Sequence, residues 1–534
     1  LARGSAAALL AGLLMVSLAP LSRAQPGPIV FTPTHGPVGA SVTIAGSGLS
    51  TVTGVLFGTS PASFTVDSYE QLTATVPPGT DTAIVEVDAP DGTSVSAEPF
   101  VVQPNILVIL TDDQRWDALG YMPTVESQLA GKGISFSNAF VENALCCPSR
   151  ASFLTGQDSH TTGVYSNDAP NGGFSAFDDH ATLATWLNDA GYDTFLTGKY
   201  LNHYWDTNGL YEPPGWDRWR AFASAFPYFN YDISLDGLGV QSYGSAPEDY
   251  STDVIAGLGD DMIRQASPQD PLFLWVAPFA PHSPFTPAPR DVGTWNGIAP
   301  WRPPSYDEAD MRDKPAYMQA LPRLSTNEQA RIDGVRQGQI EALGAVDDAV
   351  GTLLQALSDT GRLGDTIVVF SSDNGFLWGE HRRFGKVVPY EESIRVPLVI
   401  RWDRMIGSVR TDTHLVQNVD LAPTLVQAGA ATASGFDGRS LLPLLAGGPV
   451  EWRRNLLIEH DASGAPTYCA DRTPKDIFVR YVTGEEEYYR LGPLADVYER
   501  TNRITDPRFQ TRIAALRNRT RTMCSPLPPG MPPF

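Results

Sequence analysis

Basic residues and long apolar runs are both scarce in this sequence, and each shortage excludes a class of function. Lys and Arg number 38 against 60 Asp and Glu, which leaves a net charge of -22. Such a chain binds nucleic acid poorly because phosphate neutralisation needs basic patches, although a local group of cations can still hold an anionic substrate. After the N-terminal stretch, no run approaches the roughly 20 apolar residues of a membrane-spanning helix. We therefore expect neither a nucleic-acid partner nor a membrane span.

The N-terminal stretch, residues 1–24, has the composition of a signal peptide. Arg3 precedes a short apolar segment, and Ser22-Arg23-Ala24 fits a cleavage site between small residues. The apolar segment is too short to span a membrane comfortably. We therefore expect an exported protein, secreted or periplasmic, whose mature chain starts near Gln25.

Cysteine is rare, with four residues in the chain, and export makes disulfides permissible. Cys146 and Cys147 are adjacent, so a bridge between them would be strained. Cys469 and Cys524 lie far apart in the last quarter of the chain. We expect the disulfide between these two.

Residues 28–103 have the pattern of a small β-sandwich. Short runs rich in β-branched residues alternate with turns of Gly, Pro, Asp and Ser, and the alternation at 41–44 and 83–87 is strand periodicity. The opening "PTHGPVGASVTIAGSGL" resembles a TIG/IPT immunoglobulin-like domain. Such modules space or dock other domains, and we expect no chemistry here.

Residues 104–444 have the pattern of an α/β domain. The apolar runs "NILVIL", "DTFLTGK", "PLFLWVAPF", "DTIVVFSSDNG" and "RVPLVIRW" are typical of strands buried on both faces. A long amphipathic helix between the third and fourth runs starts near Ser325, with Thr326 or Asn327 as its cap, and stops at Gly361. This order predicts a mostly parallel sheet with helices on both faces. Residues 445–534 are more polar and end in a Pro-rich tail, which we interpret as a smaller C-terminal α+β subdomain.

Polar residues follow several of these strands, where ligands bind in open α/β sheets. The residues that follow the strands are Asp112, Asp113, Asp373, Asn374, Lys199 and His282. Three carboxylates and a carboxamide at one edge predict a site for a hard cation, Ca²⁺ or Mg²⁺, that faces an anion. An acidic pair after one strand can also simply cap a helix or face water. The prediction therefore depends on several strand ends offering compatible groups.

The stretch "ENALCCPSRASFLTG", residues 142–156, places Cys146 just before a short helix. Pro148 suits the first turn of this helix and Gly156 its end. A thiol there is close to the positive end of the helix dipole, which favours a nucleophile. From position alone, a structural thiol and a redox pair remain open alternatives.

The run "CCPSRASFLTG" matches the signature C-x-P-S-R-x-x-x-x-T-G, and the chain resembles the type I, formylglycine-dependent sulfatases. The resemblance extends from about residue 105 to 502 and includes "SDNG", "GEHRRFGK", "PYEESIRVPLVIR" and "EEEYYRL"; "GKYLNHY" looks like the N-acetylglucosamine-6-sulfatase branch. The resemblance implies an alkaline-phosphatase-like fold. It also implies that a formylglycine-generating enzyme, which reads Pro148 and Arg150, converts Cys146 to Cα-formylglycine.

The resemblance implies the remaining roles residue by residue. Asp112, Asp113, Asp373, Asn374 and modified Cys146 match the ligands of a calcium ion, with magnesium the lesser alternative. Arg150 and Lys199 match groups that hold the formylglycine and the sulfate, and His282 and Lys386 match groups that bind sulfate and the leaving oxygen. The implied reaction is hydrolysis of a sulfate monoester, either an aryl sulfate or a sulfated saccharide such as a 6-sulfated amino sugar.

The sequence departs from the family pattern at one position. Many sulfatases carry a histidine two residues after the lysine, where this chain has Leu201. His203 and His381 are the candidates to replace it. Aromatic residues crowd the stretch 205–231, where they either stack on a substrate ring or pack a long loop. Two other functions stay open: phosphomonoester or phosphonate-ester hydrolysis, and a non-catalytic carbohydrate-binding or adhesion protein.

Overall fold

The computed structural model describes residues 25–225, 227–461, 464–492 and 496–534, so the expected signal peptide lies outside the described residues. The chain divides into two compact units, Leu1–Thr34 with Ser41–Phe100, and His35–Ala40 with Val101–Phe534. Within the described ranges, no helix combines the length and apolarity needed to cross a membrane.

The first unit is a β-sandwich. One sheet has the order β1 (Val30–Thr32), β3 (Ser41–Ala45), β7 (Gln71–Thr75), β6 (Phe64–Val66); the other has the order β2 (His35–Gly36), β9 (Gly92–Val102), β8 (Ala83–Ala89), β4 (Gly54–Phe57), β5 (Ser60–Pro61). Alternate residues of β3, β4, β7 and β8 are buried, such as Val42 and Ile44 in β3 and Val85 and Val87 in β8. The predicted strand periodicity is therefore confirmed, because the inward-facing side chains of both sheets form the core.

The second unit contains an eight-stranded sheet. Its order is β14 (Arg218–Ala221), β13 (Asp193–Gly198), β17 (Leu272–Ala277), β10 (Asn105–Thr111), β18 (Thr366–Ser372), β21 (Leu398–Arg401), β11 (Ile134–Phe136), β22 (Arg410–Asp412). Strand β21 pairs antiparallel with both of its neighbours, and the other pairs are parallel. The predicted mostly parallel sheet is confirmed, and the carboxyl ends of β10, β13, β17 and β18 meet at one edge.

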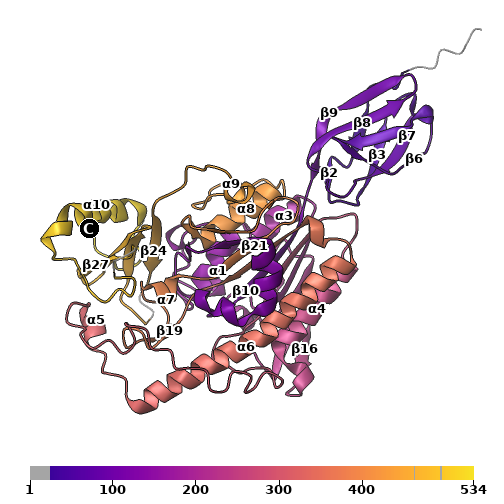
Figure 1. Ribbon diagram of the computed structural model, residues 1–534. Helices are drawn as coiled ribbons and strands as arrows, with labels where there is room; N and C mark the ends of the chain where they lie inside the picture. The colour runs from indigo at the N-terminus through magenta and orange to yellow at the C-terminus, as the bar shows by residue number, and fades with distance from the viewer. Residues whose placement is uncertain (1–24, 226, 462–463, 493–495) are drawn as a thin grey trace, which may run out of the picture. The chain divides into compact units, whose positions relative to one another are not determined.

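Helices cover both faces of this sheet (Figure 1). The helices of the unit are α1 (Cys146–Thr155), α2 (Ser159–Thr162), α3 (Leu183–Asp189), α4 (Ser251–Gln265), α5 (Ala316–Gln319), α6 (Thr326–Asp359), α7 (Glu391–Ile394), α8 (Leu421–Ala428), α9 (Leu442–Ala446) and α10 (Gln510–Met523). The apolar run of β10 is explained by burial on both faces of the sheet. Ile106 and Val108 pack in a core with α1, α3 and α8, whereas Leu107 and Ile109 pack in a second core with α4 and α6.

The long helix α6 begins and ends close to the predicted positions. The cap, however, is Ser325, and not Thr326 or Asn327 as predicted. The Ser325 hydroxyl accepts a hydrogen bond from the Glu328 backbone N–H at 3.3 Å, and the Glu328 carboxylate accepts one from the Ser325 N–H at 2.9 Å. This reciprocal capping box makes Ser325 the N-cap, one residue before the first predicted cap, Thr326.

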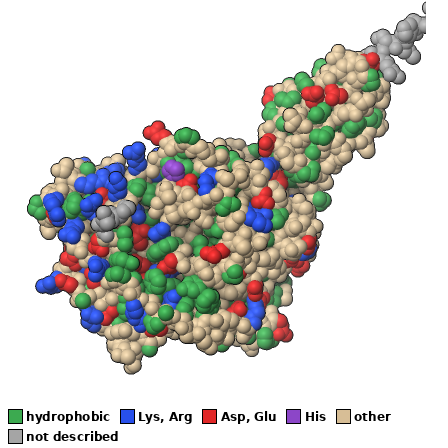
Figure 2. All heavy atoms as spheres, in the orientation of Figure 1, with side chains coloured by type: hydrophobic (Ala, Val, Ile, Leu, Met, Phe, Trp, Pro, Cys, Tyr) green, Lys and Arg blue, Asp and Glu red, His purple; other side chains and the backbone are tan. Residues whose placement is uncertain are grey.

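The C-terminal part forms a four-stranded antiparallel sheet, β24 (Leu456–His460), β25 (Tyr468–Arg472), β26 (Asp476–Tyr481), β27 (Glu486–Arg490), packed against α10. Cys469 in β25 and Cys524 after α10 form the predicted disulfide. Lys and Arg side chains gather over this region in Figure 2. Three arginines of α10 are neutralised by acids of the sheet, in the pairs Arg512–Asp476, Arg517–Glu486 and Arg519–Asp471.

Candidate active site

Two neighbouring strand ends supply the acidic part of the site. Asp112 and Asp113 follow β10, Asp373 follows β18, and all three are at most 3% exposed. The backbone turns at once, because Asp113 has φ of 68°, a left-handed conformation that is uncommon outside glycine. The Asp113 N–H donates to Asp373 Oδ1 at 3.2 Å. The parallel pairing of β10 and β18 thus brings together carboxylates that are far apart in the sequence.

Asn374 joins this group through its carboxamide. Its Nδ2 donates to Asp113 Oδ1 at 2.6 Å, and its Oδ1 accepts a hydrogen bond from Lys386 Nζ at 3.2 Å. Lys386 also contacts Asp113 Oδ1 directly. The predicted second lysine therefore lies against the predicted ligand set, although it comes from the separate segment after β20 (Phe384–Gly385).

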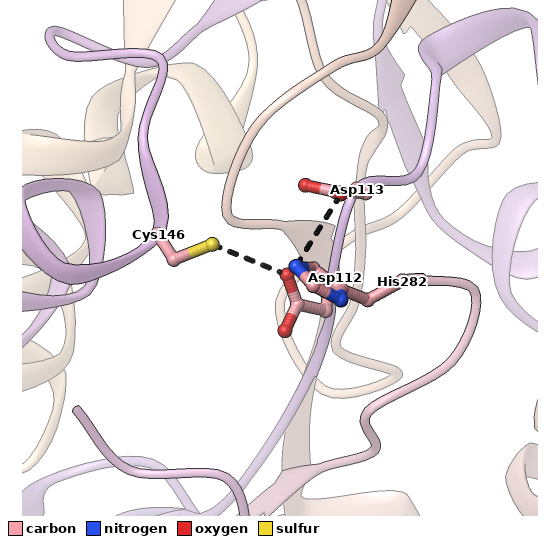
Figure 3. A group of neighbouring side chains, drawn as sticks. All are labelled: Asp112, Asp113, Cys146 and His282. Atoms are coloured by element: carbon pink, nitrogen blue, oxygen red, sulfur yellow. Dashed lines mark hydrogen bonds and ion pairs between the residues drawn. The ribbon is translucent and has the colours of Figure 1, made fainter. Parts of the chain in front are cut away.

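Cys146 is the first residue of α1, whereas the sequence predicted it just before the helix. Leu145 is the N-cap, Pro148 lies in the first turn, and Gly156 ends the helix with φ of 70°. The Cys146 thiol lies 3.5 Å from Asp112 Oδ1 and 2.8 Å from Lys386 Nζ. Figure 3 shows the thiol pointing from the start of the helix toward the aspartates.

Arg150 and Lys199 complete the charged wall. Arg150 Nε donates to Asp373 Oδ2 at 2.8 Å, and its Nη1 donates to the Lys199 carbonyl oxygen at 3.0 Å. Lys199 Nζ donates to Asp112 Oδ2. Arg150 Nη2 lies 3.7 Å from Asp112 Oδ2 and is a buried donor without a hydrogen-bond acceptor among the described residues. A buried donor of this kind suits an oxygen atom of a bound anion.

His282 approaches the aspartates from the loop after β17. Its Nδ1 lies 2.8 Å from the Ser283 carbonyl oxygen and its Nε2 lies 3.8 Å from Asp113 Oδ2. Because a carbonyl only accepts, Nδ1 carries a proton and Nε2 faces the site. One ligand atom each of Asp112, Asp113, Cys146 and His282 lies within 4.8 Å of the others. Figure 3 shows these four side chains converging.

The charges of this site oppose one another strongly. Burial alone would raise the pKa of Asp112, but Lys199, His282 and Arg150 hold it well below the usual range. Burial and the Asp112 charge raise the pKa of the Cys146 thiol to about 12, against the effect of Lys199 and Lys386. An unmodified Cys146 is therefore a neutral thiol at pH 7, in contrast to the thiolate that the helix dipole alone would favour.

The donor set fits an oxygen-preferring cation. Asp112, Asp113, Asp373 and Asn374 offer buried carboxylate and carboxamide oxygens at one sheet edge, which suits Ca²⁺. Asp373 is nevertheless bonded to Arg150. His282, which the sequence predicted beside the acidic residues, lies near Asp112 and Asp113, and the path of the loop after β17 sets its orientation.

Leu201 lines a pocket together with Lys199, Trp205, Phe279 and His282. Neither predicted substitute for the missing histidine contacts the site: His203 pairs with Asp168 at 2.8 Å and with Asp206 at 3.0 Å, and His381 pairs with Glu308 at 2.8 Å. Of the aromatic residues at 205–231, Trp205 lines the pocket, whereas Trp216, Trp219, Tyr228 and Tyr231 are buried in the two cores. Most of the aromatic side chains named here therefore pack in the protein core, as one of the two predicted alternatives had it.

Comparisons with known proteins agree with this site. The Sulfatase family matches residues 104–430, the N-sulphoglucosamine sulphohydrolase C-terminal family matches 379–524, and the IPT/TIG domain matches 29–102. The human N-acetylglucosamine-6-sulfatase is 33% identical over 376 residues, which cover 68% of this chain and 68% of that protein. The extracellular sulfatase SULF-1 homolog of Drosophila melanogaster is 34% identical over 352 residues, covering 64% of this chain but only 31% of that protein.

A solved structure points the same way. A protein in complex with its substrate D-glucosamine-2-N,6-O-disulfate superposes with a TM-score of 0.70 at 25% identity, covering 79% of this chain and 97% of that chain. The Sulfatase match alone spans more than half of the sequence and includes the Cys146 signature. It also includes the strand-end site, which consists of Asp112, Asp113, Asp373 and Asn374. The chain belongs to the sulfatase family of enzymes.

Proposed function

We propose that this chain is an exported hydrolase of sulfate monoesters that acts on a sulfated amino sugar, with a nucleophile made from Cys146. The observation that carries the proposal is the position of Cys146: it starts a buried helix, 3.5 Å from an aspartate oxygen and 2.8 Å from a lysine nitrogen. A neutral buried thiol has no evident use there, whereas an oxygen nucleophile would lie where cations can hold a sulfate.

The cofactors would add two capabilities to this site. Calcium on Asp112, Asp113, Asp373 and Asn374 would neutralise sulfate charge, and formylglycine at position 146 would supply, once hydrated, the attacking hydroxyl. Lys199, Lys386 and the free Nη2 of Arg150 would hold the sulfate oxygens.

His282 is the proposed proton donor to the leaving alcohol. Its Nε2 faces the acidic group, while its Nδ1 is held by a backbone carbonyl, so the ring is oriented for this role. A sugar alkoxide is strongly basic, and its departure therefore needs a proton at the bridging oxygen. Lys386 would assist through its positive charge.

The amino-sugar substrate is supported by the human relative and by the substrate in the superposed complex. Trp205, Phe279 and Leu201 form an apolar wall beside Lys199 and His282, which suits the face of a sugar ring. Export is supported by the composition of residues 1–24 and by the Cys469–Cys524 disulfide, which belongs to oxidising compartments.

The decisive experiment is the mass of the tryptic peptide 133–150 from protein made in its native export pathway. Formylglycine in place of cysteine lowers this mass by about 18 Da. The Cys146→Ala variant should lose sulfate-ester hydrolysis, whereas Cys147→Ala should keep it, because Cys147 is equally buried but lies outside the acidic group. An unmodified thiol in protein that hydrolyses phosphate esters would refute the proposal in favour of phosphomonoester chemistry. Saccharide binding by fully modified protein without hydrolysis would favour an adhesion role.

A further inference from the structure

A second group of potential ligands lies among residues that the proposed reaction does not use. It consists of His381, between β19 (Leu377–Trp378) and β20, Glu392 in α7, and Glu499 in the C-terminal part. Their exposed fractions are 0%, 6% and 1%. One ring nitrogen of His381 and one carboxylate oxygen each of Glu392 and Glu499 lie within 4.8 Å of one another.

Each of the three side chains has a buried atom without a hydrogen-bond partner among the described residues: His381 Nε2, Glu392 Oε2 and Glu499 Oε1. The other atoms of His381 and Glu499 are engaged. His381 Nδ1 faces Glu308 Oε2 at 2.8 Å, and Glu499 Oε2 accepts from the Glu391 backbone N–H at 2.9 Å. Buried polar atoms are nearly always paired, so unpaired atoms on three side chains that converge call for a common partner.

The chemistry of these three atoms defines that partner. Glu308 holds the proton on His381 Nδ1, which leaves Nε2 as an acceptor, and stacking on Tyr390 at 4.2 Å fixes the ring. The free oxygens of Glu392 and Glu499 are likewise acceptors when these side chains are ionised. A water molecule has only two protons to offer them, whereas a cation can contact all three. A carboxylate that orients the far nitrogen is the usual arrangement behind a metal-binding histidine.

The nearby basic side chains are bonded to groups other than the three free atoms, although Arg115 lowers the pKa of Glu392 and Lys314 lowers that of Glu499. Arg472 is bonded to Glu391 at 2.7 Å, Arg115 to Glu380 at 2.8 Å, and Lys314 to Tyr489 at 2.8 Å. Burial and the Glu380 charge raise the pKa of Glu392 to about 8, and burial with Glu391 raises the pKa of Glu499. The ionised pair is thus costly without a cation.

We infer that His381, Glu392 and Glu499 bind a divalent transition-metal ion, with Zn²⁺ the best match. One imidazole nitrogen with two carboxylate oxygens suits zinc, whereas calcium takes oxygen ligands alone. Ligands bonded to one ion at about 2.0–2.2 Å can be at most about 4.4 Å apart, so ligand atoms that lie within 4.8 Å of one another need to approach by at most about 0.4 Å. Glu392 also lines a cavity of about 330 Å³, which gives the ion a route in. The ion would tie the turn between β19 and β20 to α7 and to the C-terminal part.

Zinc alone is the probe. Full-length protein is stripped with EDTA, returned to excess Ca²⁺ to occupy the strand-end site, and titrated with Zn²⁺ in competition with a chromogenic chelator. Bound zinc is counted by elemental analysis after gel filtration. We expect one zinc per chain, at least tenfold weaker binding in Glu392→Gln and Glu499→Gln, and about 10–100-fold weaker binding in Glu308→Gln, which loosens His381.

Two controls separate this site from its surroundings. Glu391→Gln changes the adjacent carboxylate, which is bonded to Arg472 and not to the three free atoms, and should keep the zinc. Asp113→Asn disturbs the strand-end site and should also keep it. No zinc in the calcium-loaded wild type, equal zinc in Glu392→Gln and Glu499→Gln, or loss of zinc in Asp113→Asn would each overturn the inference. If the glutamate variants do not fold, anomalous diffraction at the zinc edge from wild-type crystals decides, by a peak between the three atoms or its absence.

Discussion

Replacing Lys386 by Gln tests the electrostatic basis of the proposed reaction most directly. Lys386 Nζ lies 2.8 Å from Cys146 Sγ and 3.2 Å from Asn374 Oδ1. The substitution removes a positive charge beside the position where sulfate charge would develop. Lys386 lies outside the stretch 146–156, so modification of Cys146 should proceed normally in this variant.

The size of the effect follows from the distance. Two unit charges about 4 Å apart interact by about 4 kcal/mol at an effective dielectric constant near 20. Loss of one preorganised donor costs about 2.7–4 kcal/mol by mutagenesis, or about 10²–10³ in kcat. We therefore expect kcat/KM for a sulfated amino sugar to fall by about 10²–10³ in Lys386→Gln.

The assay measures sulfate release, together with the mass of peptide 133–150 and the thermal midpoint of each protein. Arg383→Gln is the matched control, because it removes a positive charge three residues away, on the other side of β20. Arg383 donates to the Gly464 carbonyl at 3.0 Å and does not contact Cys146. Its kcat/KM should change less than twofold. A fully modified, folded Lys386→Gln enzyme within threefold of wild type would refute the reasoning.

Three further predictions follow from the same structure. His282→Asn should slow sugar sulfates by about 10²–10⁴ and aryl sulfates less, because a phenolate leaves without a proton; equal losses for both substrates would contradict the assigned role. EDTA should abolish hydrolysis and Ca²⁺ should restore it better than Mg²⁺, with Asp113→Asn needing more Ca²⁺ for half-maximal activity; calcium-independent turnover would exclude the proposed ion. Burial raises the pKa of Asp471 to about 6 despite its pairing with Arg519, so the unfolded chain loses this proton first as the pH rises. The free energy of unfolding should therefore fall between about pH 4 and 6, by about 3 kcal/mol from this residue, and Asp471→Asn should flatten the fall in urea titrations; an unchanged slope would show that Asp471 does not titrate in this way.

The sheet and the acidic part of the site could be predicted because both depend on local patterns. A strand buried on two faces must be apolar throughout, as β10 is, and the polar residue after it must lie at the sheet edge. Parallel pairing then places Asp113 and Asp373 together without any knowledge of the loops. The Cys146 signature is equally local.

The features that were missed depend on distant parts of the chain or on detailed geometry. The presence of His282 beside the acids was predicted, but the orientation of its ring toward Asp113 follows from the loop after β17, and the group of His381, Glu392 and Glu499 joins three separate segments. Neither has a periodicity or a spacing that a sequence could reveal. The cap of α6 was placed one or two residues late because Ser325, Thr326 and Asn327 are all good caps, and only the Glu328 contact decides among them.

The position of Leu201 bears on how one histidine can serve the whole reaction. Leu201 lines the pocket at the position where the family resemblance predicts a histidine, and His203 and His381 are both held by carboxylates elsewhere. His282 Nε2 remains as the imidazole nitrogen that faces the acidic group. Once His282 has given its proton to the leaving alcohol it is neutral, so it is in the state needed to accept a proton when sulfate is released. We therefore expect His282 to act in both steps, and the apolar Leu201 to shape the sugar pocket instead of taking part in proton transfer.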